Sequence, residues 1–199
     1  MNWSGMMETN LWSEKTISGL TEVIKKKVLG RSTPFLVAVT GISGSGKSTL
    51  CSALQQCFDS CAHLLLDGYN FEKEKRNKQK ITGAHPSTFD YERARQDILS
   101  LKGWKPILAP KEPICQGITM PFSPKAITLI DGQTALLIHQ WEKLYDFIVF
   151  VECPEEVLWE RKKQQGDTRE VFELRQKQFQ EYVLPLKRKA DVVVNASMR

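Results

Sequence analysis

FLVAVTGISGSGKSTL, residues 35–50, places an apolar run, a glycine loop and the start of a helical pattern in direct succession. The apolar residues 35–39 run into Thr40 without a break, as in strands that are buried on both faces. Residues 41–48 then match G-x-x-x-x-G-K-[ST] at every defined position. Strand, loop and helix in this order are the context in which the motif binds nucleoside triphosphates, so the stretch predicts a nucleotide site.

The chemistry of the loop explains its residue types. Glycines let successive backbone N–H groups approach an anion without a Cβ in the way, and the free N–H groups of the following helix add to the attraction. We expect Lys47 to reach the β- and γ-phosphates as a mobile cation, and the Ser48 hydroxyl to ligate Mg²⁺. The predicted nucleotide-binding residues are Gly41, Ser43, Gly44, Ser45, Gly46, Lys47, Ser48 and Thr49.

Length and composition favour one ordinary globular domain. The chain has 199 residues, 41% of them hydrophobic and 26% charged, which is enough for a sizeable core. We expect an N-terminal helix after a loose start over residues 1–33, and the main domain with a small lid over residues 34–199. The five cysteines form no C-x-x-C pair, so we expect reduced thiols.

The partners suggested by composition are small molecules. The net charge of +5 is mild, and no basic run alternates with aromatic residues, so nucleic acid is not an expected partner. No apolar run approaches the length of a membrane span and no signal segment is visible, which favours the cytoplasm and no membrane contact. Homo-oligomer formation is left open.

Apolar runs alternate with helical patterns along the rest of the chain, which predicts an α/β fold with a central, mostly parallel sheet. The charge run at 72–80 is interpreted as a solvated face or mobile loop, and the proline-rich segment at 103–124 as a loop or short hairpin. Asp67 and Asp131 directly follow apolar runs. Because ligands of such sheets bind at the carboxyl ends of the strands, both carboxylates are expected beside the phosphate loop.

Four further segments resemble the family of P-loop small-molecule kinases that includes uridine kinase, phosphoribulokinase and pantothenate kinase. They are LLLDGY at 64–69, HPSTFD at 85–90, TLIDG at 128–132 and LPLK at 184–187. The resemblance covers about residues 35–195 and implies the three-layer P-loop fold with a short helical lid near residues 160–170. It also implies ATP and Mg²⁺ as cofactors, and a hydroxyl of a nucleoside, sugar or pantothenate-like metabolite as phosphoryl acceptor.

The resemblance assigns roles to individual residues. Asp67 lies at the position of the family's catalytic aspartate, which orients and deprotonates the acceptor hydroxyl. Arg161 matches the leading arginine of the lid and would join Lys47 as a catalytic cation. Asp131 stands where uridine kinases carry a glutamate, and would hold Mg²⁺ together with Ser48. The acceptor-binding residues implied by the match are Tyr69, His85, Phe89 and Asp90, with Asn70 beside them.

Other interpretations remain open for these residues. Asp67 and Asp131 also suit strand-end turns, Asp90 suits a helix N-cap, and the lid residues other than Arg161 suit a solvated basic helix face. The lid reads Gln165-Gly166 where uridine kinases carry an R-G pair, although Arg169 or Arg175 could compensate.

The segment 108–113 lacks the tyrosine and histidine that read the base in uridine kinases, so another sugar, alcohol or vitamin-like acceptor is as well supported as uridine. The shortened lid and the aspartate at position 131 support a second hypothesis, a catalytically weak nucleotide-binding regulatory protein on the same fold.

Overall fold

A five-stranded parallel sheet forms the centre of the computed structural model, which describes residues 12–71, 73–111, 118–139 and 143–196. In spatial order the strands are β2 (Cys61–Leu65), β5 (Ile127–Asp131), β1 (Phe35–Gly41), β6 (Phe147–Glu152) and β7 (Val192–Asn195). The central strand β1 is buried over its whole length, as its unbroken apolar run predicts. The predicted α/β fold with a parallel sheet is confirmed.

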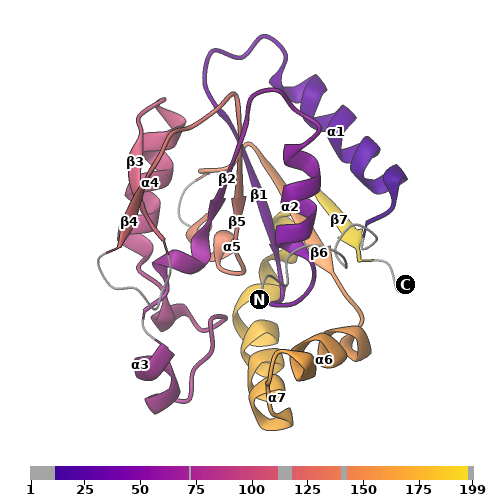
Figure 1. Ribbon diagram of the computed structural model, residues 1–199, viewed down its shortest axis with the longest axis vertical. Coiled ribbons are helices and arrows are strands. Elements are labelled where there is room, and N and C mark those ends of the chain that lie inside the picture. The colour runs from indigo at the N-terminus through magenta and orange to yellow at the C-terminus, as the bar shows by residue number, and fades with distance from the viewer. Residues whose placement is uncertain (1–11, 72, 112–117, 140–142, 197–199) are drawn as a thin grey trace, which may run out of the picture.

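Helices cover both faces of the sheet (Figure 1). They are α1 (Glu14–Val28), α2 (Lys47–Gln55), α3 (Lys73–Lys78), α4 (Tyr91–Lys102), α5 (Ala135–His139), α6 (Glu155–Gln164) and α7 (Arg169–Gln178). Short turns of 3₁₀-helix lie at η1 (Leu66–Tyr69), η2 (Pro86–Thr88) and η4 (Leu184–Lys189), and a π-helical turn, η3 (Phe179–Val183), follows α7. Among the described residues, no helix is long and apolar enough to cross a membrane.

Alternate side chains of β1 enter two separate cores, which gives the three layers. Phe35, Val37 and Val39 pack with the buried faces of α1 and α2. Leu36 and Ala38 point to the opposite face and pack with α4, α5 and the segment around η3. The period of two along a strand is the cause, because successive side chains point to opposite faces of the sheet.

The N-terminal helix begins at Glu14, with Ser13 as its N-cap, and packs beside α2 as expected. Just before it, the indole Nε1 of Trp12 donates a hydrogen bond to the carbonyl oxygen of Gly46, at 3.1 Å. The segment preceding the main domain therefore contacts the phosphate loop directly, which its sequence did not indicate. The predicted loose start at residues 1–11 lies outside the described residues.

Two uncertain segments take definite forms. The proline-rich segment contains an antiparallel hairpin of β3 (Ile107–Pro110) and β4 (Thr119–Phe122), one of its two predicted forms. The charge run contains α3, and its Arg76 is half-buried rather than solvated. Figure 1 shows α3 on one side and the pair α6–α7 on the other, beyond the carboxyl ends of the strands.

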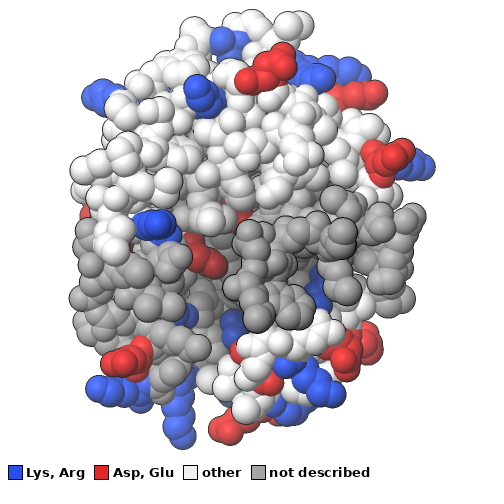
Figure 2. Space-filling model, viewed as in Figure 1, with Lys and Arg blue, Asp and Glu red and all other residues white. Residues whose placement is uncertain are grey.

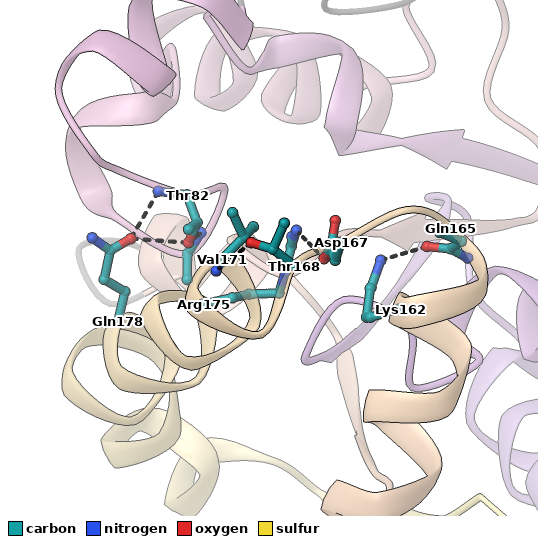
Figure 3. A network of polar contacts seen from close by, with 9 residues as sticks. Thr82, Lys162, Gln165, Asp167, Thr168, Val171, Arg175 and Gln178 are labelled. Atoms are coloured by element: carbon teal, nitrogen blue, oxygen red, sulfur yellow. Dashed lines mark hydrogen bonds and ion pairs between the residues drawn. The ribbon is translucent and has the colours of Figure 1, made fainter.

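Gln178 connects α7 to the chain that follows α3 (Figure 3). Its side-chain oxygen Oε1 accepts hydrogen bonds from the backbone N–H and the hydroxyl of Thr82, at 2.8 and 2.9 Å. Its Nε2 donates to the carbonyl oxygen of Lys80 at 3.3 Å. These bonds join α7 to the chain that follows α3.

We expect Gln178→Ala to lower the free energy of unfolding by about 1–3 kcal/mol, because the buried Thr82 N–H would lose its partner. Urea unfolding followed by circular dichroism measures the change. The matched control is Gln180→Ala, since Gln180 is exposed in the next turn. Equal unfolding midpoints for the two variants would contradict the expectation.

Candidate functional site

The phosphate loop joins the end of β1 to the first residue of α2. Gly41 and Gly44 have φ angles of +144° and +90°, which residues with a Cβ rarely adopt. A Cβ on Gly41 would also lie 2.3 Å from the carbonyl oxygen of Val151 in β6. On Gly44 it would lie 3.0 Å from Cε of Lys162 in α6. Both glycines are therefore required by conformation and by close neighbours.

Lys47 begins α2 and lies back over its own loop. Its side chain is buried, and Nζ donates a hydrogen bond to the carbonyl oxygen of Ile42 at 3.0 Å. Its charge lowers the pKa of both Asp67 and Asp131. One ammonium group thus lies close to both strand-end carboxylates, in the arrangement that the sequence predicted.

The side chains of Ser48, which follows Lys47 in α2, and Asp131, at the end of β5, are in contact. The Ser48 hydroxyl donates to Oδ2 of Asp131 at 2.5 Å, and Nε2 of His63 lies 3.5 Å from the same oxygen. Burial raises the pKa of Asp131, but the neighbouring His63 imidazole, the charge of Lys47 and the hydrogen bond from Ser48 outweigh it and hold the pKa below its usual value. An ionised carboxylate and a hydroxyl at the phosphate loop are the hard oxygen donors that Mg²⁺ prefers, so these residues fit the metal.

Cys51 lies behind this pair, with its sulfur in a group with His63 and Asp131 whose donor atoms lie within 4.8 Å of one another. Burial, followed by the charge of Asp131, raises the pKa of the Cys51 thiol well above its usual value. A protonated thiol is a poor metal ligand, because the thiolate is the binding form. The four described cysteines are free, in line with the expectation of reduced thiols.

Asp67 lies in η1, directly after β2, where the chain leaves the sheet. Its carboxyl borders a cavity of about 100 Å³ that also reaches the phosphate loop. The residues that line the cavity are Ser43, Asp67, Asn70, Arg76, Gly83, Gln133, Thr134 and Arg175. The surrounding protein raises the pKa of Asp67 by desolvation, with Asp131 adding to the rise, while Lys47, Arg76 and Lys162 oppose it.

Helix α6 brings two neighbouring cations to the loop, and they behave differently. Nη1 of Arg161 donates to the carbonyl oxygen of Gly44 at 2.9 Å, so this guanidinium holds the loop backbone. Lys162 lies against Gly44 with its Nζ 2.8 Å from Oε1 of Gln165 (Figure 3). Burial and the nearby charges of Arg175 and Lys47 lower the pKa of Lys162 to about 8, while Asp167 and Asp67 oppose the fall.

Comparison with known proteins agrees with this geometry. A family model described as an AAA domain matches residues 37–181, which is most of the chain. The chain belongs to this family.

Among curated proteins, the uridine kinases of Latilactobacillus sakei subsp. sakei (strain 23K) and Haemophilus influenzae (strain PittEE) are each 25% identical over 182 residues. The matches cover 82% and 80% of this chain, and 86% and 85% of those proteins.

A solved structure described as a "Possible Uridine Kinase" from Bacillus stearothermophilus superposes with a TM-score of 0.60 at 20% identity. It covers 90% of this chain and 97% of that one. The predicted P-loop fold and the predicted resemblance to uridine kinases are thereby confirmed. The relatives support a P-loop kinase of small metabolites, and none of them determines the substrate of this member.

None of the four predicted acceptor residues of this AAA-domain protein is among the residues that line the cavity. Tyr69 and Phe89 are buried and pack together, and the Tyr69 hydroxyl donates to Oδ2 of Asp97 at 2.8 Å. Asp90 caps α4 by accepting a hydrogen bond from the backbone N–H of Arg93. The ring of His85 contacts Tyr182 edge-on at 4.9 Å. Their role toward an acceptor stays a prediction.

The sequence missed Arg76, Gln133, Thr134 and Lys162. Gln133 and Thr134 follow β5 directly, so the strand-end argument that selected Asp131 would have reached them two residues further on. Arg76 lies in a charge run without periodicity, and its sequence offered no signal. Asn70 and Arg175, which entered only as secondary candidates, both line the cavity.

Proposed function

We propose that this chain is an ATP-dependent kinase that transfers the γ-phosphoryl group to a hydroxyl of a small metabolite. The observation that carries the proposal is the position of Asp67, whose carboxyl shares one small cavity with Ser43 of the phosphate loop. A base and a phosphate-binding loop at one point are what phosphoryl transfer to a hydroxyl requires. The family and its uridine kinase relatives support the same reaction class.

The proposed roles follow from the contacts. Backbone N–H groups of residues 43–48 hold the phosphates, and the Lys47 ammonium exchanges the Ile42 carbonyl for a phosphate oxygen. Ser48 and Asp131 hold Mg²⁺, which when bound offsets the negative charge of the β- and γ-phosphates. Arg161 keeps the Gly44 peptide in place, and Lys162 contributes positive charge above it.

Asp67 acts on the acceptor in this proposal. Its carboxylate accepts the hydroxyl proton while the hydroxyl oxygen bonds to the γ-phosphorus. The bond from that phosphorus to the bridging oxygen of ADP breaks on the opposite side, and ADP leaves with that electron pair. A carboxyl whose pKa is raised by burial is the stronger base, which suits this role.

The test is a screen for acceptor-dependent ADP formation over nucleosides, sugars, sugar acids, pantothenate and small alcohols, with Mg²⁺ and ATP. We expect one class of acceptor to be phosphorylated, and the phosphorylated product to appear by mass spectrometry. Nucleotide binding by calorimetry without turnover on any acceptor would favour the alternative, a nucleotide-binding regulatory protein.

For the metal, we expect Asp131→Asn to raise the Mg²⁺ concentration needed for half-maximal activity by about tenfold, because one charged ligand is lost. A Mg²⁺ titration at fixed ATP measures the shift. Glu155→Gln serves as the control, since Glu155 is an exposed carboxylate on α6. An unchanged titration in Asp131→Asn would remove this residue from the metal site.

A further inference from the structure

Two arginines from distant parts of the chain line the small cavity beside Asp67. Arg76 comes from α3, and Arg175 comes from α7 on the opposite side of the site. The pKa of Arg76 is lowered, first by burial and further by the nearby charge of Arg175, against the opposing effect of Asp67. Two guanidinium groups therefore lie close enough at the wall of one cavity to affect each other's charge. Figure 2 shows basic and acidic side chains interspersed on the surface at this end of the molecule.

The charges that could balance these arginines are few. Arg175 forms an ion pair with Asp167, 2.8 Å between Nη2 and Oδ2 (Figure 3). None of the ion pairs between described residues involves Arg76, whose Nε donates to the carbonyl oxygen of Phe71; the charge that favours its ionised form is that of Asp67. In the proposed reaction, Asp67 takes a proton and loses that charge. That proton comes from the acceptor hydroxyl, so the net charge of the cavity does not change. Arg76 nevertheless loses the ionised carboxylate that favours its charge, and an anionic group on the acceptor would replace it.

Three side chains of the cavity wall also carry buried polar atoms without a hydrogen-bond partner among the described residues. They are Nε of Arg175, Nε2 of Gln133 and Oδ1 of Asn70. Buried polar groups are nearly always paired, so three unpaired ones around one cavity indicate a ligand that supplies the missing partners. Two of the three are donors and one is an acceptor, which suits a molecule with anionic or hydroxyl oxygens and at least one O–H.

The dimensions and the walls of the cavity separate this ligand from the nucleotide. Only Ser43 of the lining residues belongs to the phosphate loop, and the others come from η1, α3, α7 and the turns after α3 and β5. A volume of about 100 Å³ is small beside the roughly 300–1,000 Å³ of sites for drug-sized ligands. A cavity of this size suits a compact polyol head better than a whole nucleoside.

We propose that the phosphoryl acceptor is a small hydroxylated anion, whose carboxylate or phosphate group pairs with Arg76 and Arg175 while one hydroxyl faces Asp67. The guanidinium group is planar and presents parallel N–H donors, which match the oxygens of either anion. Gln133 and Asn70 then bond the remaining oxygens and hydroxyls of the same molecule. This inference rests on the proposed kinase function and names its substrate class.

The experiment compares acceptors that share a carbon skeleton and differ in charge. Glycerol, D-glycerate and glycerol 3-phosphate form one set, and glucose, gluconate and glucose 6-phosphate form another. Each compound is titrated into the protein saturated with Mg²⁺ and a non-hydrolysable ATP analogue, and is also assayed for phosphorylation with ATP. We expect a charged member of a set to bind, and to exceed its neutral member by at least about tenfold in kcat/KM. Comparing the carboxylate member with the phosphate member of each set shows which of the two anionic groups the site binds.

Variants test the two arginines directly. Arg76→Met and Arg175→Met are expected to raise the KM of the charged acceptor by about 10- to 100-fold, leaving the KM of ATP within about twofold. Lys78→Met on α3 and Lys177→Met on α7 are the matched controls, because both lysines are exposed on the same helices. We expect both controls to behave as the wild type. Arg175→Lys should restore part of the affinity, since the charge returns without the planar geometry.

The outcomes separate the two proposals. Equal kcat/KM for the neutral and charged members of a set would overturn the proposal of an anionic acceptor and leave the proposed kinase function intact. A raised KM for ATP in the arginine variants, with the acceptor KM unchanged, would assign the arginines to the nucleotide and overturn the inference as well. Charged compounds that bind but are never phosphorylated would retain the anion site and reject the kinase. Binding of no charged compound at millimolar concentration would reject the anion site on its own.

Discussion

Asp67→Asn is expected to lower kcat by about 10²–10⁴-fold, because the amide keeps the shape of the side chain but cannot accept the hydroxyl proton. The dissociation constant of ATP should stay within about threefold of the wild type, since the phosphates are held by the loop and Lys47. Steady-state kinetics on the acceptor found in the screen, together with calorimetry of ATP, measure the two effects. Asp59→Asn is the control, because Asp59 is an exposed carboxylate outside the site.

The pH dependence gives a second readout of Asp67. A general base must be ionised, so activity is lost as the pH falls through its pKa. Desolvation raises the pKa of Asp67 above that of an ordinary aspartate, and the low-pH limb of kcat/KM should shift upward with it. We expect that limb to disappear in Asp67→Asn. Full activity of the variant, or an unchanged limb, would remove Asp67 from the proton transfer.

The part of the site that the sequence predicted best is contiguous in the chain. Phe35 to Ser48 contain a strand, a loop and a helix start whose geometry depends on neighbours within a few residues. A fixed spacing of residue types therefore determines most of it. The strand-end aspartates were also predictable, since Asp67 and Asp131 follow apolar runs and parallel strands end at one edge.

The cavity wall could not be predicted in the same way, because it depends on contacts between distant segments. Arg76 and Arg175 line one cavity from α3 and α7, and Gln178 of α7 binds Thr82, 96 residues earlier, in the chain after α3. A charge run carries no periodic signal that singles out Arg76 as a residue that lines a cavity. The acceptor side of the site thus needed the tertiary structure.

In the lid, the sequence alone also did not show which of two neighbouring cations lies closer to the reacting groups. Arg161 and Lys162 are adjacent on α6, and adjacent helical residues point about 100° apart. The resemblance to the family selected Arg161, whose guanidinium donates to the Gly44 carbonyl oxygen, and its catalytic role stays a prediction. Of the two cations, Lys162 is the one whose charge lowers the pKa of Asp67. Gln165, which replaces the arginine of the R-G pair, accepts the hydrogen bond that positions the lysine.

Lys162→Met is therefore expected to lower kcat by about 10²–10³-fold, the usual loss when one group that stabilises transition-state charge is removed. Lys163→Met is the matched control, because Lys163 is the next residue of α6 and is exposed. Steady-state kinetics with ATP and the identified acceptor measure both variants. A kcat for Lys162→Met within threefold of the control would show that Lys162 acts only in packing, and would return the catalytic role to Arg161.

The pH profile separates charge from packing at this position. The pKa of Lys162 is about 8 in the protein without nucleotide, so its ammonium is present below that pH and lost above it. Because kcat/KM reports the free enzyme, the wild type should lose activity as the pH rises through about 8. Arginine stays protonated throughout this range, so Lys162→Arg should retain most of the activity and lack the decline. A decline that persists unchanged in Lys162→Arg would arise from another group, and the charge of Lys162 would then not limit the reaction.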